Sequence, residues 1–233
     1  MFGNVKALSI PEGKVIKVAD GSNKVLWSAI RLPSIYQEVE WVKAELGRSV
    51  LIDLGIKFDT AARVEMGQYI HSDAACHIFG AAENSGKVRC MLTAPYSGVV
   101  SPYGSGTSGY ITSQSVKYKL NALNEYELVW KKGLLSVLNK TNNGFSSVSQ
   151  QIECTMSSNM YLFAQNYNGS ARFEGIRQIH YFKYYDKNDN LICDLIPCYR
   201  KSDGVIGMYD VARELFLTNV GLSTQTFTKG NDV

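Results

Sequence analysis

The sequence is poor in the residues that build metal, phosphate or membrane sites. It has three histidines, five prolines and no C-x-x-C pair among 233 residues. Lys and Arg exceed Asp and Glu by only 24 − 21 = 3, and they are scattered, which argues against nucleic-acid binding. No run approaches the roughly 18 apolar residues of a membrane span, so we expect no membrane insertion. With 45% hydrophobic residues, the chain can form a sizeable core.

Two further absences concern the compartment. Residues 1–14 contain no apolar segment of signal-peptide length, so we expect synthesis in a cytoplasm and a soluble product. Cysteine is odd in number, and the three histidines do not supply zinc-like spacings beside it. We therefore predict buried free thiols in a reducing compartment. The cysteines are Cys76, Cys90, Cys154, Cys193 and Cys198.

The sequence also lacks a sustained apolar period of 3.6 residues. Short runs rich in β-branched and aromatic residues take its place, bounded by Gly, Asn, Ser and Asp about every ten residues. This pattern predicts an all-β antiparallel sandwich or barrel rather than an α/β protein. Examples are residues 50–54, 63–70, 88–93, 126–131 and 160–164.

The sequence predicts one β-hairpin near the C-terminus. Residues 176–186 (IRQIHYFKYYD) alternate, but both faces of the alternation bear large apolar groups. We therefore expect a strand that is covered on both sides or crosses a rim. Residues 187–190 form the turn, and 191–196 return as the partner strand.

The first residues form a separate unit in this prediction. Val15–Val18 and Val25–Trp27 flank the turn residues Asp20–Asn23, which indicates a small hairpin. We divide the chain into an N-terminal hairpin or leader at 1–33 and a β-sandwich at 34–233. A segment of this length buries little surface alone, so it must dock on the sandwich, on a second copy or on a partner.

Two carboxylate pairs are candidates for glycan hydrolysis. Residues i and i+2 of a strand share a face, as Glu38 and Glu40, and Glu125 and Glu127, would. Neither pair has a third acidic residue on its strand. We favour a solvated strand edge or strand start for both pairs, because charged residues are mostly exposed. The sequence has no G-x-S-x-G elbow and no phosphate-binding glycine loop before a helix.

Tyrosines in polar loops suggest binding without catalysis. Tyr96, Tyr103 and Tyr110 lie in or beside a Gly/Ser-rich stretch, and Tyr167 lies in an Asn-rich turn. Aromatic faces beside planar polar groups suit carbohydrates. The alternative is that the rings lean on the sheet and expose only their hydroxyls.

The turn at 186–190 (DKNDN) contains the ligand types of a calcium site. It also has the composition of an ordinary hairpin turn, which we favour. We therefore expect no cofactor.

Residues 195–210 (LIPCYRKSDGVIGMYD) contain a short polar segment, Tyr199–Gly204, between two apolar runs. We call this segment the polar knot. Pro197 cannot donate to a sheet ladder, so we expect it at a strand end or along an edge. The next strand follows at 205–209, where Gly207 permits close backbone approach or a bulge.

The charges of the knot admit two interpretations, a charged site or a turn. Asp203 can accept hydrogen bonds from its own backbone, and Gly204 suits the left-handed position. Arg200 then pairs with Asp203 or with Asp210. On this interpretation the knot is structural, and any binding site lies in other loops.

The same stretch resembles a module of bacteriophage and prophage tail or baseplate proteins. The resemblance implies a concanavalin A-like, laminin-G-like jelly roll in a virion or surface protein, and it transfers no catalytic residue. We expect a non-enzymatic module that binds a host-surface glycan, with other tail proteins as partners and a possible homotrimer. The alternatives are a laminarinase-like glycan-cleaving enzyme and a purely architectural virion protein. The matching residues are 50–58, 62–66, 78–81, 172–177, 181–186, 194–210 and 216–219.

Overall fold

The computed structural model describes most of the chain. The described residues are 17–19, 25–28, 32–44, 50–58, 62–71, 76–83, 88–96, 98–106, 109–112, 115–131, 133–149, 156–172, 177–221 and 227–233. Every helix or strand assigned within them is a β-strand, so the predicted all-β class is confirmed. None of these residues forms a helix that could span a membrane.

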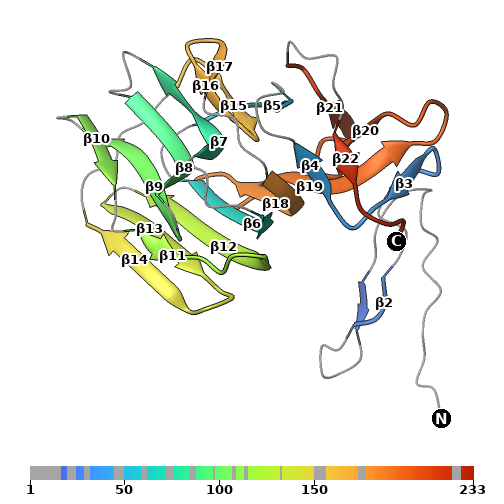
Figure 1. The fold of residues 1–233 in the computed structure, drawn as a ribbon, viewed down its shortest axis with the longest axis horizontal. Coiled ribbons are helices and arrows are strands. Elements are labelled where there is room, and N and C mark those ends of the chain that lie inside the picture. The colour runs from blue at the N-terminus through green and yellow to red at the C-terminus, as the bar shows by residue number, and fades with distance from the viewer. Residues whose placement is uncertain are drawn as a thin grey trace.

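The described strands form three sheets, and Figure 1 shows how they are arranged. The small sheet pairs β1 (Lys17–Ala19) with β2 (Val25–Ser28). A nine-stranded sheet contains β5 (Ile52–Lys57), β7 (Cys76–Glu83), β8 (Val88–Tyr96), β9 (Val99–Gly106), β10 (Gly109–Thr112), β11 (Val116–Lys117), β15 (Asn159–Leu162), β16 (Gln165–Tyr167) and β17 (Ser170–Arg172).

An eleven-stranded sheet completes the fold. It contains β3 (Tyr36–Glu38), β4 (Val42–Ala44), β6 (Ala62–Ile70), β12 (Ala122–Lys131), β13 (Leu134–Asn139), β14 (Gly144–Val148), β18 (Arg177–Tyr185), β19 (Leu191–Arg200), β20 (Ile206–Asp210), β21 (Leu215–Thr218) and β22 (Thr228–Lys229). The pairings between described strands are antiparallel except for β16 with β7.

The core lies between the two large sheets. Along β12, buried and half-exposed residues alternate, which sends Tyr126, Leu128 and Trp130 inward. Phe79 of β7 meets this layer from the opposite sheet, with its ring centroid 6.1 Å from that of Trp130 and 5.3 Å from that of Phe182. The expected β-sandwich is thus confirmed by aromatic contacts between the sheets.

Strand β18 departs from the simple alternation expected for residues 176–186. Its pairing register with β6 shifts between Ile179 and Tyr181, so the residues on either side of this irregularity change faces. Ile179 and Phe182 are therefore both in the core, although alternation put them on opposite faces. The apolar residues on both predicted faces are explained by this register shift.

The expectation for Pro197 was wrong. Strand β19 runs through it to Arg200, and Pro197 pairs with Met208 of β20. On its other edge β19 pairs with β18 up to Leu195 and with β3 from Cys198. Pro197 lies between these two partners, where its carbonyl accepts the Val39 N–H at 3.0 Å. Pro197 has no backbone N–H, but it lies where the partner of β19 changes from β18 to β3. No regular hydrogen bond of the sheet is therefore lost there.

A second apolar cluster covers the outer face of β19, β20 and β21. We call it the outer cluster. The Tyr36 ring lies 5.0 Å from that of Tyr209 and 4.9 Å from that of Phe216. Strands β19 and β20 thus bury side chains on both faces at this end of the sheet. Its members are Leu32, Ile196, Cys198 and Tyr209, with Tyr36, Val211 and Phe216 against them.

The two ends of the sandwich segment lie side by side. Val39 forms an isolated β-bridge with Asp232, and the Gly230 N–H donates to the carbonyl of Trp41 at 3.0 Å. Figure 1 shows β3 and the C-terminus at one end of the molecule, with β10 and β14 at the other. The division into a leader at 1–33 and a sandwich at 34–233 stays a prediction, because residues 1–16, 20–24 and 29–31 lie outside the described part.

Candidate functional site

The polar knot folds as a turn between β19 and β20. Gly204 has φ +70°, and Oδ1 of Asp203 accepts the Val205 N–H at 3.2 Å, as the sequence predicted. Arg200 pairs with Asp203, with Nη2 2.6 Å from Oδ2 and Nε 3.0 Å from Oδ1. This bidentate pair lowers the pKa of the Asp203 carboxyl. Arg200 and Asp203 therefore neutralise each other within the turn.

Gly207 is required by a close approach of strands. A Cβ built on it would lie 2.2 Å from the carbonyl oxygen of Leu217 in β21. Of the two roles predicted for this glycine, close backbone approach is confirmed.

Asp210 pairs with Arg213, so the alternative pairing with Arg200 was wrong. Its carboxylate is fully buried, and Oδ1 accepts the backbone N–H groups of Asp194 at 3.0 Å and of Ala212 at 3.0 Å. Oδ2 accepts the Nε–H of Arg213 at 2.5 Å. The last residue of the motif thus organises the turn between β20 and β21.

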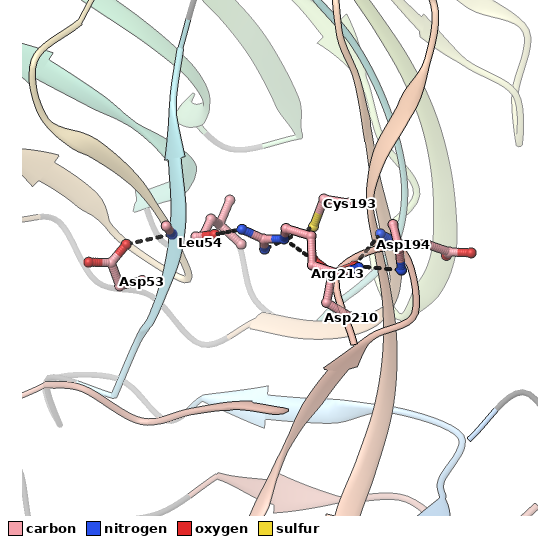
Figure 2. Close-up of polar contacts among 8 residues, drawn as sticks. Asp53, Leu54, Cys193, Asp194, Asp210 and Arg213 are labelled. Atoms are coloured by element: carbon pink, nitrogen blue, oxygen red, sulfur yellow. Dashed lines mark hydrogen bonds and ion pairs between the residues drawn. The ribbon is translucent and has the colours of Figure 1, made fainter. Parts of the chain in front are cut away.

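Arg213 extends this contact to the opposite sheet. Figure 2 shows its guanidinium between Asp210 and the backbone of Leu54 in β5. Nη1 donates to the Leu54 carbonyl at 2.7 Å, and Nη2 lies 3.7 Å from Sγ of Cys193. Burial, together with the Asp210 carboxylate, raises the pKa of the Cys193 thiol. Through Asp210, the motif therefore holds the arginine that joins the two sheets, which is a structural role.

The candidate catalytic carboxylates are engaged with other side chains. Oε1 of Glu125 accepts the Tyr181 hydroxyl at 3.1 Å, and burial and this carboxylate raise the pKa of Tyr181. Glu127 forms an ion pair with Lys140 at 3.0 Å. Both glutamates project from the outer face of β12, opposite its core face.

The other pair lies at the far end of the sheet. Glu38 ends β3, and Glu40 follows it, where Oε2 accepts the backbone N–H of Asn231 at 3.2 Å. This contact helps to join the two ends of the sandwich segment.

Three of the four proposed tyrosines lie on adjacent strands. Tyr96 pairs with Val99 at the first residue of β9, and Tyr110 pairs with Ser105 near its last. These ends are 105 − 99 = 6 residues apart, or about 20 Å along a strand. Tyr103 lies between them and is half-buried. The side chains of Tyr96 and Tyr110 are outside the described part, so their role stays a prediction.

Tyr167 lies apart from the other three. It is half-buried at the end of β16, next to the turn residues Asn168 (φ 49°) and Gly169 (φ 87°). The guanidinium carbon of Arg172 lies 3.7 Å from the centroid of its ring. One ring face of Tyr167 is therefore covered by a cation.

An open hollow of about 290 Å³ lies where β11 and β14 meet at the edges of the two sheets. Phe145 borders it with 63% of its surface exposed. Gly144 permits the close approach of β14 to β11, since a Cβ at this position would lie 2.7 Å from Cγ1 of Val116. The hollow thus combines an exposed aromatic ring, an amine and an amide. Its lining residues are Ser115, Val116, Lys117, Asn142, Gly144 and Phe145.

Three asparagines fix the backbone beside the hollow. The Lys117 carbonyl accepts Nδ2 of Asn139 at 3.1 Å and Nδ2 of Asn142 at 2.9 Å. Asn124 holds Lys119, accepting its N–H at 2.9 Å and donating to its carbonyl at 2.8 Å. Asn124 and Asn139 are fully buried and hydrogen-bond to each other at 3.1 Å. We call these residues, with Asn142, the asparagine clamp.

The sequence prediction did not include Phe145 or Lys117. Asn142–Gly144 has the composition of a turn, and residues 144–148 read GFSSV. A lone aromatic residue among small and hydroxylated ones indicates a solvent-facing ring. The contact between Gly144 at the start of β14 and Val116 of β11 is a tertiary contact that no local pattern reveals.

The histidines and the turn at 186–190 contain groups that could bind a metal ion or act in catalysis. His71 Nε2 lies 2.8 Å from Oε1 of Gln178, whose Nε2 lies 3.0 Å from Nε2 of His180. Burial lowers the pKa of His180. Oδ1 of Asp186 accepts the Asn188 N–H at 2.8 Å, as in an ordinary turn. In the described ranges, no three His, Cys, Asp or Glu residues are grouped so that they could hold a metal ion.

The cysteine prediction is confirmed where it can be checked. Cys76, Cys90, Cys193 and Cys198 are buried and outside any disulfide among the described residues, and Cys154 lies outside these residues. Burial raises the pKa of Cys198 to about 12.

Comparison with known proteins gives structural neighbours only. No protein-family model matches the sequence, and no curated protein matches it. The mouse laminin α1 chain, domains LG4-5, has a TM-score of 0.48 at 11% identity over 84% of this chain and 45% of its own. The full-length tailspike protein 2 of Escherichia coli O157:H7 bacteriophage CAB120 has a TM-score of 0.43 at 11% identity over 74% and 31%.

A third neighbour is the enzymatically active domain of bacteriophage CBA120 tailspike protein 2, with a TM-score of 0.40 at 12% identity over 65% of this chain and 28% of its own. The chain thus spans less than half the length of each neighbour. At these identities and scores the comparisons assign no function.

Proposed function

We propose that this chain is a non-enzymatic carbohydrate-binding module of a phage tail or a related surface assembly. The hollow beside Lys117, Asn142 and Phe145 is its binding site. The observation that carries the proposal is the exposed ring of Phe145 at the edge of this hollow. Sugars stack their apolar faces on aromatic rings and hydrogen-bond to amides and amines at the ring edge.

The position of the hollow supports a display role. The sandwich segment begins and ends at the same end of the molecule, near β3 and the C-terminus, while β14 lies at the other (Figure 1). A module attached through its termini would therefore present the hollow outward. The resemblance of residues 195–210 to phage tail modules is consistent with this use, with other tail proteins as assembly partners and a trimer as one possible state.

The surroundings of the carboxylates favour binding over cleavage. Glycoside hydrolysis needs two carboxyl groups across one bond, about 5–5.5 Å or 6.5–9.5 Å apart. Glu125 and Glu127 instead contact Tyr181 and Lys140. Replacing Glu38, Glu40, Glu125 and Glu127 by glutamine should leave glycan binding intact, and abolished cleavage of any polysaccharide would restore the enzymatic alternative.

A glycan array with the chain displayed on a multivalent carrier tests the proposal. Phe145→Ser should weaken any signal about tenfold or more, since stacking of a sugar on an aromatic ring is lost. Val220→Ser is the matched control, because Val220 is 58% exposed and lies outside the hollow. Silence of the wild-type chain against all glycans would support a purely architectural role instead.

A further inference from the structure

The segment that borders the hollow presents two lysines on one side. Lys117 and Lys119 are exposed and flank Tyr118, which is buried. Side chains at i and i+2 of an extended segment point the same way, with Cα atoms about 6.6 Å apart. The two amines can therefore reach one ligand from the same side.

The asparagine clamp makes this arrangement rigid. It engages the backbone of Lys117 from two side chains and that of Lys119 through both its N–H and its carbonyl. Two clamp residues, Asn124 and Asn139, are buried polar groups, which proteins retain in the core only when they are well hydrogen-bonded. A backbone fixed in this way restricts where the lysine side chains begin, which lowers the entropy lost on binding.

The charges around the hollow are of one sign. Among the described residues, its lining includes Lys117 and no acidic residue. The nearby Lys140 is neutralised by Glu127 at 3.0 Å. The ion pairs found among the described residues do not include Lys117 or Lys119. A ligand that carries negative charge would therefore be favoured over a neutral one of the same shape.

We infer that the hollow selects an anionic saccharide, whose carboxylate or sulfate groups pair with Lys117 and Lys119 while a sugar ring stacks on Phe145. This inference rests on the proposed carbohydrate-binding function and adds the class of ligand. Carboxylate and sulfate share the chemistry that a lysine amine recognises, so the test must separate them.

Two matched ligand pairs make the test. Oligogalacturonate is compared with its methyl ester, and dextran sulfate with dextran, each by isothermal titration calorimetry at low and high salt. We expect at least one anionic member to bind about tenfold more tightly than its neutral partner, and the difference to shrink at high salt. The pair that shows the difference identifies carboxylate or sulfate as the group recognised.

Lysine variants separate the contribution of Lys117 and Lys119 to ligand affinity from that of net charge. Lys117→Gln with Lys119→Gln should remove the preference for the anionic ligand, about tenfold in affinity, and the corresponding arginine double variant should keep it. The control replaces Lys57 and Lys187 by glutamine, two exposed lysines away from the hollow with the same change in net charge. Unchanged affinities in the control and reduced ones in the first variant support the inference.

Three outcomes would overturn it. Equal binding of charged and neutral partners, reduced by Phe145→Ser, would refute the anionic preference and leave the proposed function standing. Equally tight binding of polyglutamate, insensitive to Phe145→Ser, would show simple attraction of polyanions. No binding of any saccharide would refute the proposed function together with this inference.

Discussion

Arg213 donates from Nε to the buried carboxylate of Asp210 and from Nη1 to the Leu54 carbonyl on the opposite sheet, the latter at 2.7 Å. One side chain thus connects the motif strand β20 with β5 (Figure 2). A second tie runs nearby, since Oδ1 of Asn219 accepts the Leu51 N–H at 3.0 Å. Asp210, the last residue of the distinctive stretch 195–210, therefore anchors the side chain that connects the two sheets.

Removing either partner of this pair should destabilise the fold. We expect Asp210→Ala to cost about 3–5 kcal/mol, because the backbone N–H groups of Asp194, Ala212 and Arg213 and the Arg213 guanidinium lose their acceptor. Arg213→Met should cost about 2–3 kcal/mol, because Arg213 is partly exposed. Urea denaturation measures both, and the double variant should cost less than the sum. Asp232→Ala, which breaks an exposed pair with Lys229, is the control and should cost far less. Near-native stability of Asp210→Ala would refute the cross-sheet role.

The two glycines of the motif should respond differently to alanine. Gly204 has φ +70° and open space around it, so Gly204→Ala should cost about 1 kcal/mol of conformational strain. Gly207 would bring its Cβ to 2.2 Å from the Leu217 carbonyl, so Gly207→Ala should cost about 3 kcal/mol. Thermal and urea unfolding measure the difference, and equal losses would contradict the close approach of β20 and β21.

The Arg200–Asp203 ion pair should contribute to stability but not to glycan binding. Arg200 and Asp203 are both about half-exposed, so Asp203→Ala should lower Tm only slightly, through loss of the ion pair and of the Val205 contact. Any glycan binding should be unchanged, because the turn belongs to β19 and β20 and the hollow to β11 and β14. Calorimetry with the ligand that binds the wild-type chain checks this, and a loss of affinity in the folded variant would return the knot to the list of candidate sites.

The sequence analysis correctly predicted those features that are set by residues close together in the sequence. The strand periodicity gave the all-β class, and Asp203 with Gly204 gave the turn. The register shift between Ile179 and Tyr181 of β18 was not predictable, because it is set by pairing with β6, a strand far away in the sequence. Pro197 was misplaced for a similar reason, since the exchange of partner strands beside it involves residues far apart in sequence.

The candidate site shows the same limit. The tyrosine prediction rested on composition, and the structure separates Tyr96 from Tyr110 along β9. The hollow depends on β11 and β14, which belong to different sheets and meet only in the folded chain. Composition can indicate an exposed ring such as Phe145, but not the amine that lies beside it.

Two buried polar side chains should be replaceable with a gain in stability. The described residues offer no hydrogen-bond partner to the Tyr126 hydroxyl or to either amide atom of Gln68, which is fully buried. Tyr126→Phe should therefore stabilise the fold by about 1 kcal/mol, and Gln68→Met by about 1–3 kcal/mol. Asn124→Leu is the matched control and should destabilise it, because all its polar atoms are hydrogen-bonded. Urea titrations that show losses for Tyr126→Phe and Gln68→Met would indicate partners for these groups.

Stability should fall at alkaline pH. Burial raises the pKa of Cys198 from 9.0 to about 12 and also raises those of Cys193 and Tyr126. Below pH 9 these groups are protonated in both states, so their contribution is fully present. Above it the unfolded chain releases protons that the folded chain retains, and stability declines until the folded pKa is passed. Urea midpoints measured from about pH 7 to pH 11 should decrease, and less so in Cys198→Ala, which lacks one such group. A midpoint independent of pH over this range would show that the thiols and Tyr126 ionise equally in both states.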